Sequence, residues 1–179
     1  MKKAKKHTKK HSKKGFSLIE LLIVVAIILI IAAIAIPNLL RSRIAANEAS
    51  AVGSLRTLNT AEVTYNTTYP ATGFACSLTV MGPPASGSSA TSVTAGLIDA
   101  NLALGSKSGY NFAIPASGNN CNASAAGINT TYSAGASPVS SGVTGQRYFC
   151  SDGSGVIQYS QTAAFTDNTG TCSTGGTPI

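Results

Sequence analysis

The chain has 179 residues and a formal net charge of +7, but the positive charge is concentrated at one end. Eight of the 13 basic residues are lysines between Lys2 and Lys14, and both histidines lie in the same stretch. Without residues 1–15, five basic residues face six acidic ones, which gives a net charge of −1. The body therefore lacks the spread of basic side chains that a folded nucleic-acid-binding surface needs. It also lacks histidine, which excludes Ser–His and Cys–His nucleophiles and a histidine metal site there.

Residues 1–15 form a basic, polar leader, and an apolar run follows from Phe16 to Ile36, broken only by Ser17 and Glu20. As a helix this run would be about 31 Å long, enough to cross a hydrocarbon core of about 30 Å. Lysines before such a run are typical of a signal that holds the preceding end in the cytoplasm. We therefore predict a membrane-spanning or filament-core segment at residues 16–36.

Pro37 follows the apolar run and predicts a helix break, because proline removes one backbone hydrogen bond and clashes with the preceding turn. Beyond it, apolar residues recur mostly at three-, four- and seven-residue spacings as far as Tyr65, with charged side chains between them. We predict one helix over residues 16–67, whose second half, residues 38–67, is amphipathic. Such a helix would be about 75 Å long, so its first half is expected to protrude from a small domain.

Residues 68–179 are rich in Gly, Ser, Thr and Asn, and we predict that they form a globular β head. A short helix is expected at residues 95–104 and loops at 85–94 and 134–145. Strands are expected at 109–114, 128–133, 146–150 and 155–160. Asp152-Gly153 lies between the last two strands and predicts a hairpin turn. The expected fold class is α+β, with one long N-terminal helix packed against an antiparallel sheet.

Glu20 is the one charged residue inside the apolar run. A carboxylate in a membrane helix costs about 2.5–3.5 kcal/mol on insertion scales and normally has a partner. If a peptidase cut between Gly15 and Phe16, the new α-amine would lie four residues from Glu20 and could neutralise it, within one chain or between neighbours. Pairing between neighbours would set the axial register of subunits. The alternative is that Glu20 is protonated or reaches the membrane interface.

The segment GFSLIEL at residues 15–21, with the apolar residues behind it, closely resembles the prepilin signature of the type IV pilin family. The short leader and Phe16 resemble the type IVa subclass. The resemblance implies a pilin fold, cleavage after Gly15 by a prepilin peptidase, and N-methylation of Phe16 by the same enzyme. It also implies that inner-membrane machinery assembles the subunits into a helical homo-oligomeric filament. There Glu20 would pair with the Phe16 amine of a neighbour, and Pro37 would mark where the helix loosens.

All four cysteines, Cys76, Cys121, Cys150 and Cys172, lie in the predicted head. An even number of cysteines in an exported domain suggests disulfides, with three possible connectivities. We favour Cys76–Cys121 and Cys150–Cys172, because the second would tie back the C-terminal segment as the C-terminal disulfide loop does in many pilins. The cysteines lack zinc-knuckle spacing, and we expect no metal, cofactor or catalytic residue.

The predicted function is structural and not enzymatic: we predict a major pilin that polymerises into a type IV pilus (fimbrium) for adhesion, twitching motility or uptake. The precursor and subunit pool would lie in the inner membrane, and the assembled pilus outside the cell. A type II secretion pseudopilin or a minor pilin shares the same N-terminal features. A more remote alternative is a Sec-exported soluble binding domain that begins near Ile36, because Ala33-Ile34-Ala35 offers a signal-peptidase site. An uncleaved anchor would leave Glu20 unpaired.

Overall fold

The computed structural model describes residues 15–114, 128–162, 172 and 176–179. The chain divides into two compact units, an N-terminal unit, Met1–Leu39, and a C-terminal unit, Leu40–Ile179. The boundary falls inside the long helix α1, Leu18–Thr68, which contributes residues to both units. The predicted single long helix is therefore confirmed.

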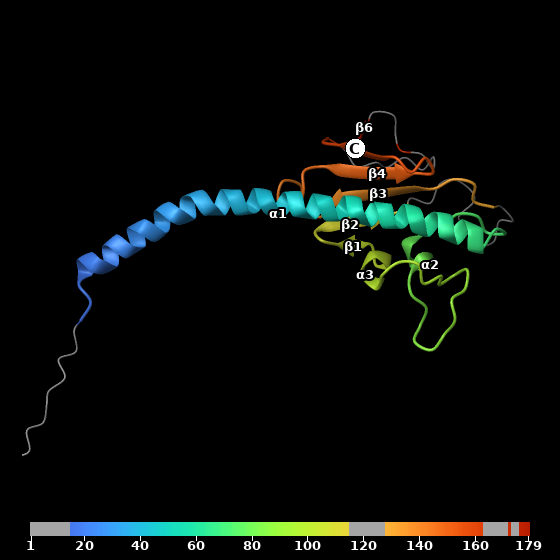
Figure 1. The fold of residues 1–179 in the computed structure, drawn as a ribbon, viewed down its shortest axis with the longest axis horizontal. Helices are drawn as coiled ribbons and strands as arrows, with labels where there is room; N and C mark the ends of the chain where they lie inside the picture. Colours follow the sequence, from blue (N-terminus) through green and yellow to red (C-terminus); the bar gives the residue numbers. More distant parts are fainter. Residues whose placement is uncertain (1–14, 115–127, 163–171, 173–175) are drawn as a thin grey trace, which may run out of the picture. The chain divides into compact units, whose positions relative to one another are not determined.

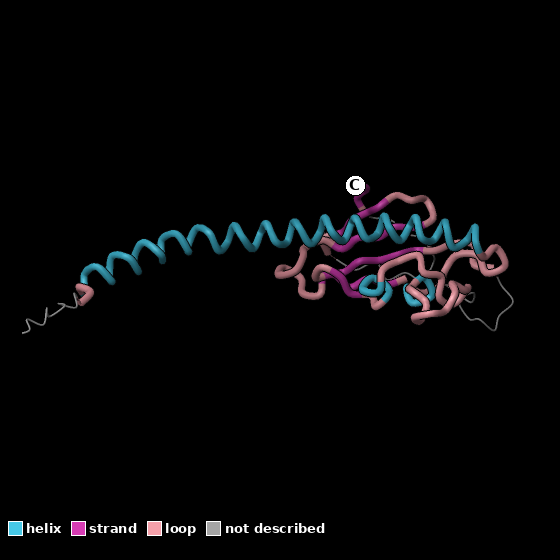
Figure 2. Tube along the Cα trace, turned by 60° about the horizontal axis from the view of Figure 1, so that its bottom comes forward, coloured by secondary structure: helices cyan, strands magenta, loops and turns pink. Residues whose placement is uncertain are grey.

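Within the C-terminal unit, one face of α1 is buried against the sheet. Its buried apolar side chains are Ala51, Leu55, Leu58, Ala61 and Tyr65. These positions recur every three or four residues, which places them on one side of an α-helix. Figures 1 and 2 show this part of α1 lying along one face of the sheet. The amphipathic half of the helix thus builds the core of the C-terminal unit.

The sheet has six strands in the order β1-β2-β3-β4-β5-β6, and every neighbouring pair is antiparallel. The strands are β1 Ser106–Lys107, β2 Tyr110–Ala113, β3 Ser133–Pro138, β4 Tyr148–Asp152, β5 Ile157–Ser160 and β6 Thr177–Pro178. The predicted α+β class is confirmed, and so is the hairpin, because β4 and β5 pair on either side of Gly153. Short strands in sequence order form a meander that needs no long crossover.

Three sequence expectations differ from the structure. The predicted helix at residues 95–104 is shorter in the structure, where α3 spans Ala100–Ala103. Asp99 is its N-cap, and the Asp99 side chain accepts a hydrogen bond from the backbone N–H of Leu102. The strand expected at residues 128–133 is displaced to β3, so the first part of the predicted loop at 134–145 is also wrong. The residues of β3 are mostly small, but pairing with β2 and β4 on both sides overrides their weak strand propensity. The four-residue helix α2, Leu78–Met81, was not predicted.

Tyr110 in β2 combines a buried aromatic ring with a polar contact. It is fully buried, its hydroxyl donates to the carbonyl oxygen of Arg147 at 2.9 Å, and its ring centroid lies 5.9 Å from that of Phe149. Gly145 lies directly against the Tyr110 ring, so that a Cβ atom at this position would overlap it. The chain therefore needs glycine at position 145 for packing.

We expect Gly145→Ala to destabilise the C-terminal unit by about 1–3 kcal/mol, because the buried Tyr110 ring would have to shift. Thermal unfolding of the full chain in detergent, followed by tyrosine near-ultraviolet circular dichroism, measures the effect. Gly153→Ala is the matched control, since a Cβ atom there meets no atom within 4 Å; it should change stability by less than about 0.5 kcal/mol. Equal effects of the two substitutions would contradict the packing argument.

Candidate functional site

The predicted cleavage junction lies just before α1. Gly15, Phe16 and Ser17 precede the first helical residue, Leu18, and the Phe16 side chain is 88% exposed. The Gly15–Phe16 peptide bond therefore lies outside regular structure in the described chain. Cleavage there stays a prediction.

Glu20 makes a hydrogen bond that the sequence analysis missed. Its Oε2 accepts from the backbone N–H of Ser17 at 2.9 Å. With Ser17 as the N-cap and Glu20 three residues later, this contact is the acidic half of a capping box, which the Ser-x-x-Glu spacing could have revealed. Glu20 thus also stabilises the start of α1. Its predicted pairing with the Phe16 amine stays a prediction, because Phe16 is here bonded to Gly15.

The apolar segment in the N-terminal unit is exposed almost throughout. Among residues 15–39 only Ala32 is partly covered, and the most apolar 18-residue window has a mean hydropathy of 3.3 with none of it buried. By length and composition this is the one helix in the described part of the chain that could cross a membrane. A helix that is apolar all round is stable only in lipid or among other apolar helices.

Pro37 lies inside α1 and does not end it. Proline lacks the backbone N–H that would bond to the carbonyl four residues earlier, but the bonds on either side keep the segment helical. The helix α1 therefore continues through Pro37, and the kink or local melting expected there stays a prediction. Loosening at Pro37 on assembly stays a prediction.

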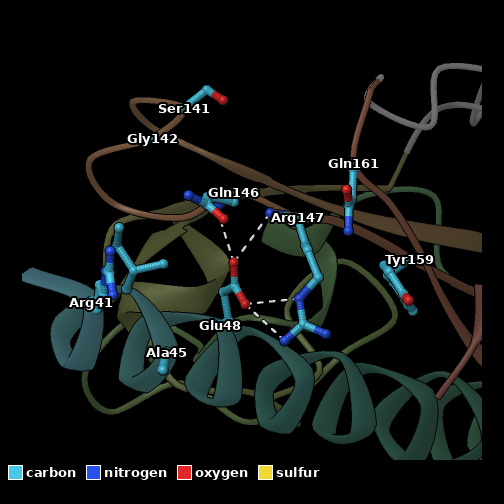
Figure 3. Close-up of a pocket in the computed structure, with 10 residues that line it drawn as sticks. Arg41, Ala45, Glu48, Ser141, Gly142, Gln146, Arg147, Tyr159 and Gln161 are labelled. Carbon is cyan, nitrogen blue, oxygen red and sulfur yellow. Dashed lines mark hydrogen bonds and ion pairs between the residues drawn. The ribbon is translucent and has the colours of Figure 1, made fainter.

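An ion pair between the buried Glu48 and the partly exposed Arg147 joins α1 to the segment before β4 (Figure 3). The carboxylate of Glu48 accepts at Oε1 from the backbone N–H groups of Gln146, at 2.9 Å, and Arg147, at 3.2 Å. Its Oε2 accepts from Nε of Arg147 at 2.8 Å and lies 2.7 Å from Nη2. The Arg147 guanidinium also lies over the rings of Phe149 and Tyr159, at 5.4 and 5.2 Å from their centroids. Four donors thus satisfy the buried Glu48 carboxylate.

A cavity of about 660 Å³ opens beside this ion pair, wholly within the C-terminal unit. Glu48 and Arg147 line it together with residues of α1, of the β3–β4 connection and of β5, including Arg41, Ile44, Gly142 and Tyr159. Its lining is partly polar and partly apolar. The sequence alone did not indicate this cavity, because its two sides are about 100 residues apart in the chain.

Glu62 is a second buried carboxylate on α1, and it is only half satisfied. Its Oε2 accepts from the backbone N–H of Ala75 at 2.8 Å, whereas Oε1 has no hydrogen-bond partner among the described residues. Burial raises the pKa of Glu62 to about 8, against a smaller opposing effect of the hydrogen bond from Ala75. Glu48 and Glu62 share the helical spacing of the buried apolar positions, and that spacing could have marked both as inward-facing.

One disulfide is present in the described residues. Cys150 in β4 is bonded to Cys172, the pairing that the resemblance implied, and the backbone N–H of Cys172 also donates to Asp152 at 3.0 Å. The segment around residue 172 is thereby tied to the β4–β5 hairpin. Cys121 lies outside the described residues, so its pairing with Cys76 stays a prediction. No cluster of potential metal ligands occurs within the described ranges.

We expect the raised pKa of Glu62 to make the C-terminal unit less stable as pH rises from about 4.5 to about 8. The folded state holds the Glu62 proton more tightly than the unfolded state, so this stabilisation is complete below the unfolded pKa of 4.5 and is lost through the folded pKa. Glu62→Gln should flatten the pH dependence of the urea midpoint of the full chain in detergent. Asp99→Asn, at an exposed carboxylate, should keep the wild-type slope. An unchanged slope in Glu62→Gln would show that Glu62 titrates normally.

The similarity of this chain to known proteins lies in its N-terminal region. Residues 10–36 match the family model described as the prokaryotic N-terminal methylation motif. Over 35 residues the chain is 69% identical to the type IV wide pilus major component PilA4 of Thermus thermophilus, a match that covers 20% of this chain and 27% of that relative. No solved structure shows significant similarity to the chain.

The motif and the fold agree with each other. The matched residues include the exposed apolar start of α1, and the rest of that helix packs on an antiparallel sheet in a pilin-like α+β architecture. The N-terminal region of the chain therefore carries the N-terminal methylation motif of type IV pilins and pseudopilins.

Proposed function

We propose that the chain is a prepilin that is cleaved between Gly15 and Phe16, N-methylated at Phe16 and polymerised as the major subunit of a type IV pilus. The observation that carries the proposal is the exposed apolar segment at residues 16–36, which lies within the matched motif and contains a single carboxylate, Glu20. An apolar helix of this kind needs lipid before assembly and other apolar helices after it.

In this proposal the subunit occupies two environments in turn, the membrane and then the filament. It first lies in the inner membrane, with the lysine-rich leader in the cytoplasm, where a prepilin peptidase removes the leader. Inner-membrane assembly machinery then moves it into a helical homo-oligomer outside the cell. The apolar helices would form the filament core, and the sheet-bearing heads would coat it. Adhesion, twitching motility or uptake are the functions that such a pilus would serve.

The Glu20 carboxylate can accept further hydrogen bonds, as the proposed pairing requires. The backbone N–H of Ser17 occupies only part of the acceptor capacity of this carboxylate, because an ionised carboxylate has about four lone-pair sites. A terminal amine from a neighbouring subunit could therefore bind Glu20 without breaking its contact with Ser17. The pairing would cancel a charge that lipid or apolar helices otherwise tolerate poorly.

The alternatives differ in what they leave unexplained. A pseudopilin or minor pilin would share every N-terminal feature, but the relative with the matching N-terminus is described as a major component, which supports the proposed role. A Sec-exported soluble domain would require cleavage between Ala35 and Ile36, a bond that lies inside α1. Mass spectrometry of the main protein in sheared surface filaments tests the proposal against these alternatives. A methylated Phe16 terminus supports the proposal, and a terminus near Ile36 or an intact leader overturns it.

We expect Glu20→Ala and Glu20→Gln to be cleaved normally but to yield at least tenfold fewer filaments, because loss of one partner from a buried charge pair typically costs about 2–5 kcal/mol. Glu20→Gln distinguishes charge from helix capping, since glutamine keeps the acceptor for the Ser17 N–H. Immunoblots of membrane and sheared fractions measure both steps. Normal filament yield from Glu20→Gln would mean that capping, and not charge pairing, is what assembly requires.

A further inference from the structure

None of the three arginines on α1 forms an ion pair with a described residue of the chain. In the described part of the chain the two ion pairs are Arg147–Glu48 and Lys107–Asp99. Arg41, Arg43 and Arg56 are exposed on α1, and none of them is paired with a carboxylate among the described residues. Three exposed cations on one helix thus remain available for an anionic partner outside the chain.

Arg41 differs from the other two because it lines the cavity beside Glu48 and Arg147. Arg43 follows it by two residues, or about 200° around the helix, and does not line the cavity. Figure 3 shows dashed lines from Glu48 to Gln146 and Arg147, whereas none reaches Arg41. Arg41 is therefore the one unpaired cation at this cavity among the described residues.

Arg41 determines the net charge of the side chains that line the cavity. The Glu48 carboxylate receives two bonds from backbone N–H groups and two from the Arg147 guanidinium, so its negative charge is already compensated. The remaining net charge of the lining is positive. Polar side chains such as Gln146 and Gln161 and apolar ones such as Ile44 complete the wall. This lining suits an anion that carries an organic body, and a guanidinium fork matches the geometry of a phosphate group.

The position of Arg41 in the sequence indicates where that anion comes from. Arg41 follows the last residue of the apolar run, Ile36, by five residues, which in a helix is a rise of about 7.5 Å. The polar headgroup layer on each side of a bilayer is about 5–8 Å thick, and long arginine side chains extend along apolar surface to reach it. With residues 16–36 in the membrane, a separation of five residues lets the guanidinium of Arg41 reach the phospholipid phosphates of the far leaflet. This step depends on the proposed membrane-inserted precursor.

We propose that Arg41 and the cavity beside the Glu48–Arg147 pair bind the phosphate group of a membrane phospholipid while the subunit is in the bilayer. The phosphate would lie against the Arg41 guanidinium, with the rest of the headgroup in the cavity. The lipid would hold the C-terminal unit at the membrane surface until the subunit is extracted. Binding is thus a property of the membrane pool and is lost when the helix leaves the lipid.

Native mass spectrometry of the full chain, released from membranes in mild detergent and mixed with phosphatidylglycerol, tests the proposal. The wild type should retain phosphatidylglycerol in preference to diacylglycerol, which has the same tails and no phosphate. Arg41→Gln should lower the retained fraction at least tenfold. Arg43→Gln, at nearly the same height on the helix but away from the cavity, and Arg56→Gln, farther along the exposed surface, should stay within twofold of the wild type.

Three results would overturn the proposal. Equal retention of diacylglycerol would show binding through the tails alone. Equal losses in Arg41→Gln and Arg43→Gln would show a diffuse basic surface and no site at the cavity. A wild type that retains no phosphatidylglycerol but forms Arg41-dependent dimers would assign the cavity to an acidic group of a second subunit.

Carbonate extraction of membranes from the same cells separates this inference from the proposed function. If the chain resists extraction and carries a methylated Phe16, the prepilin proposal holds whatever the lipid result is. If the chain is extracted as a peripheral or soluble protein, the prepilin proposal fails, and with it the membrane setting on which lipid binding depends.

Discussion

An exposed apolar helix is the constraint on which the rest of this protein depends. Residues 16–36 present apolar side chains in every direction, and none of the most apolar window is covered by the chain itself. Burial of apolar surface contributes about 25 cal/mol per Å², so a helix of this size left in water would be strongly unfavourable. The chain therefore cannot be stable as an isolated soluble molecule with this segment exposed. Its stable states require lipid or other apolar helices around this segment.

The helix carries three carboxylates, and each is accommodated differently. Glu20 is exposed and accepts the N–H of Ser17 at the helix start. Glu48 is buried and fully bonded, which fixes α1 to the segment before β4. Glu62 is buried with one oxygen unpartnered, and its pKa is raised accordingly. Only Glu20 belongs to the apolar segment, and its proposed counter-ion is the Phe16 amine that cleavage would create.

The sequence predicted the long helix and the fold class because both follow from local patterns: an apolar run, then amphipathic spacing, then turn residues between short strands. It did not predict β3, whose small residues become a strand because neighbours on both sides supply backbone partners. It also missed the Glu48–Arg147 pair and the cavity beside it, because these join positions about 100 residues apart. The capping contact of Glu20 is local, and the Ser-x-x-Glu spacing from Ser17 to Glu20 is sufficient to predict it.

The two outermost strands of the described sheet, β1 and β6, have only two residues each. Long open strand edges invite further backbone pairing with other molecules, whereas such short edges offer few unpaired donors and acceptors. At the high local concentration of a crowded membrane or a packed fibre, cross-β aggregation would otherwise compete with ordered stacking. The short edge strands of the described sheet therefore offer little template for such pairing, which leaves the apolar segment at residues 16–36 as the main surface through which copies of this chain could associate.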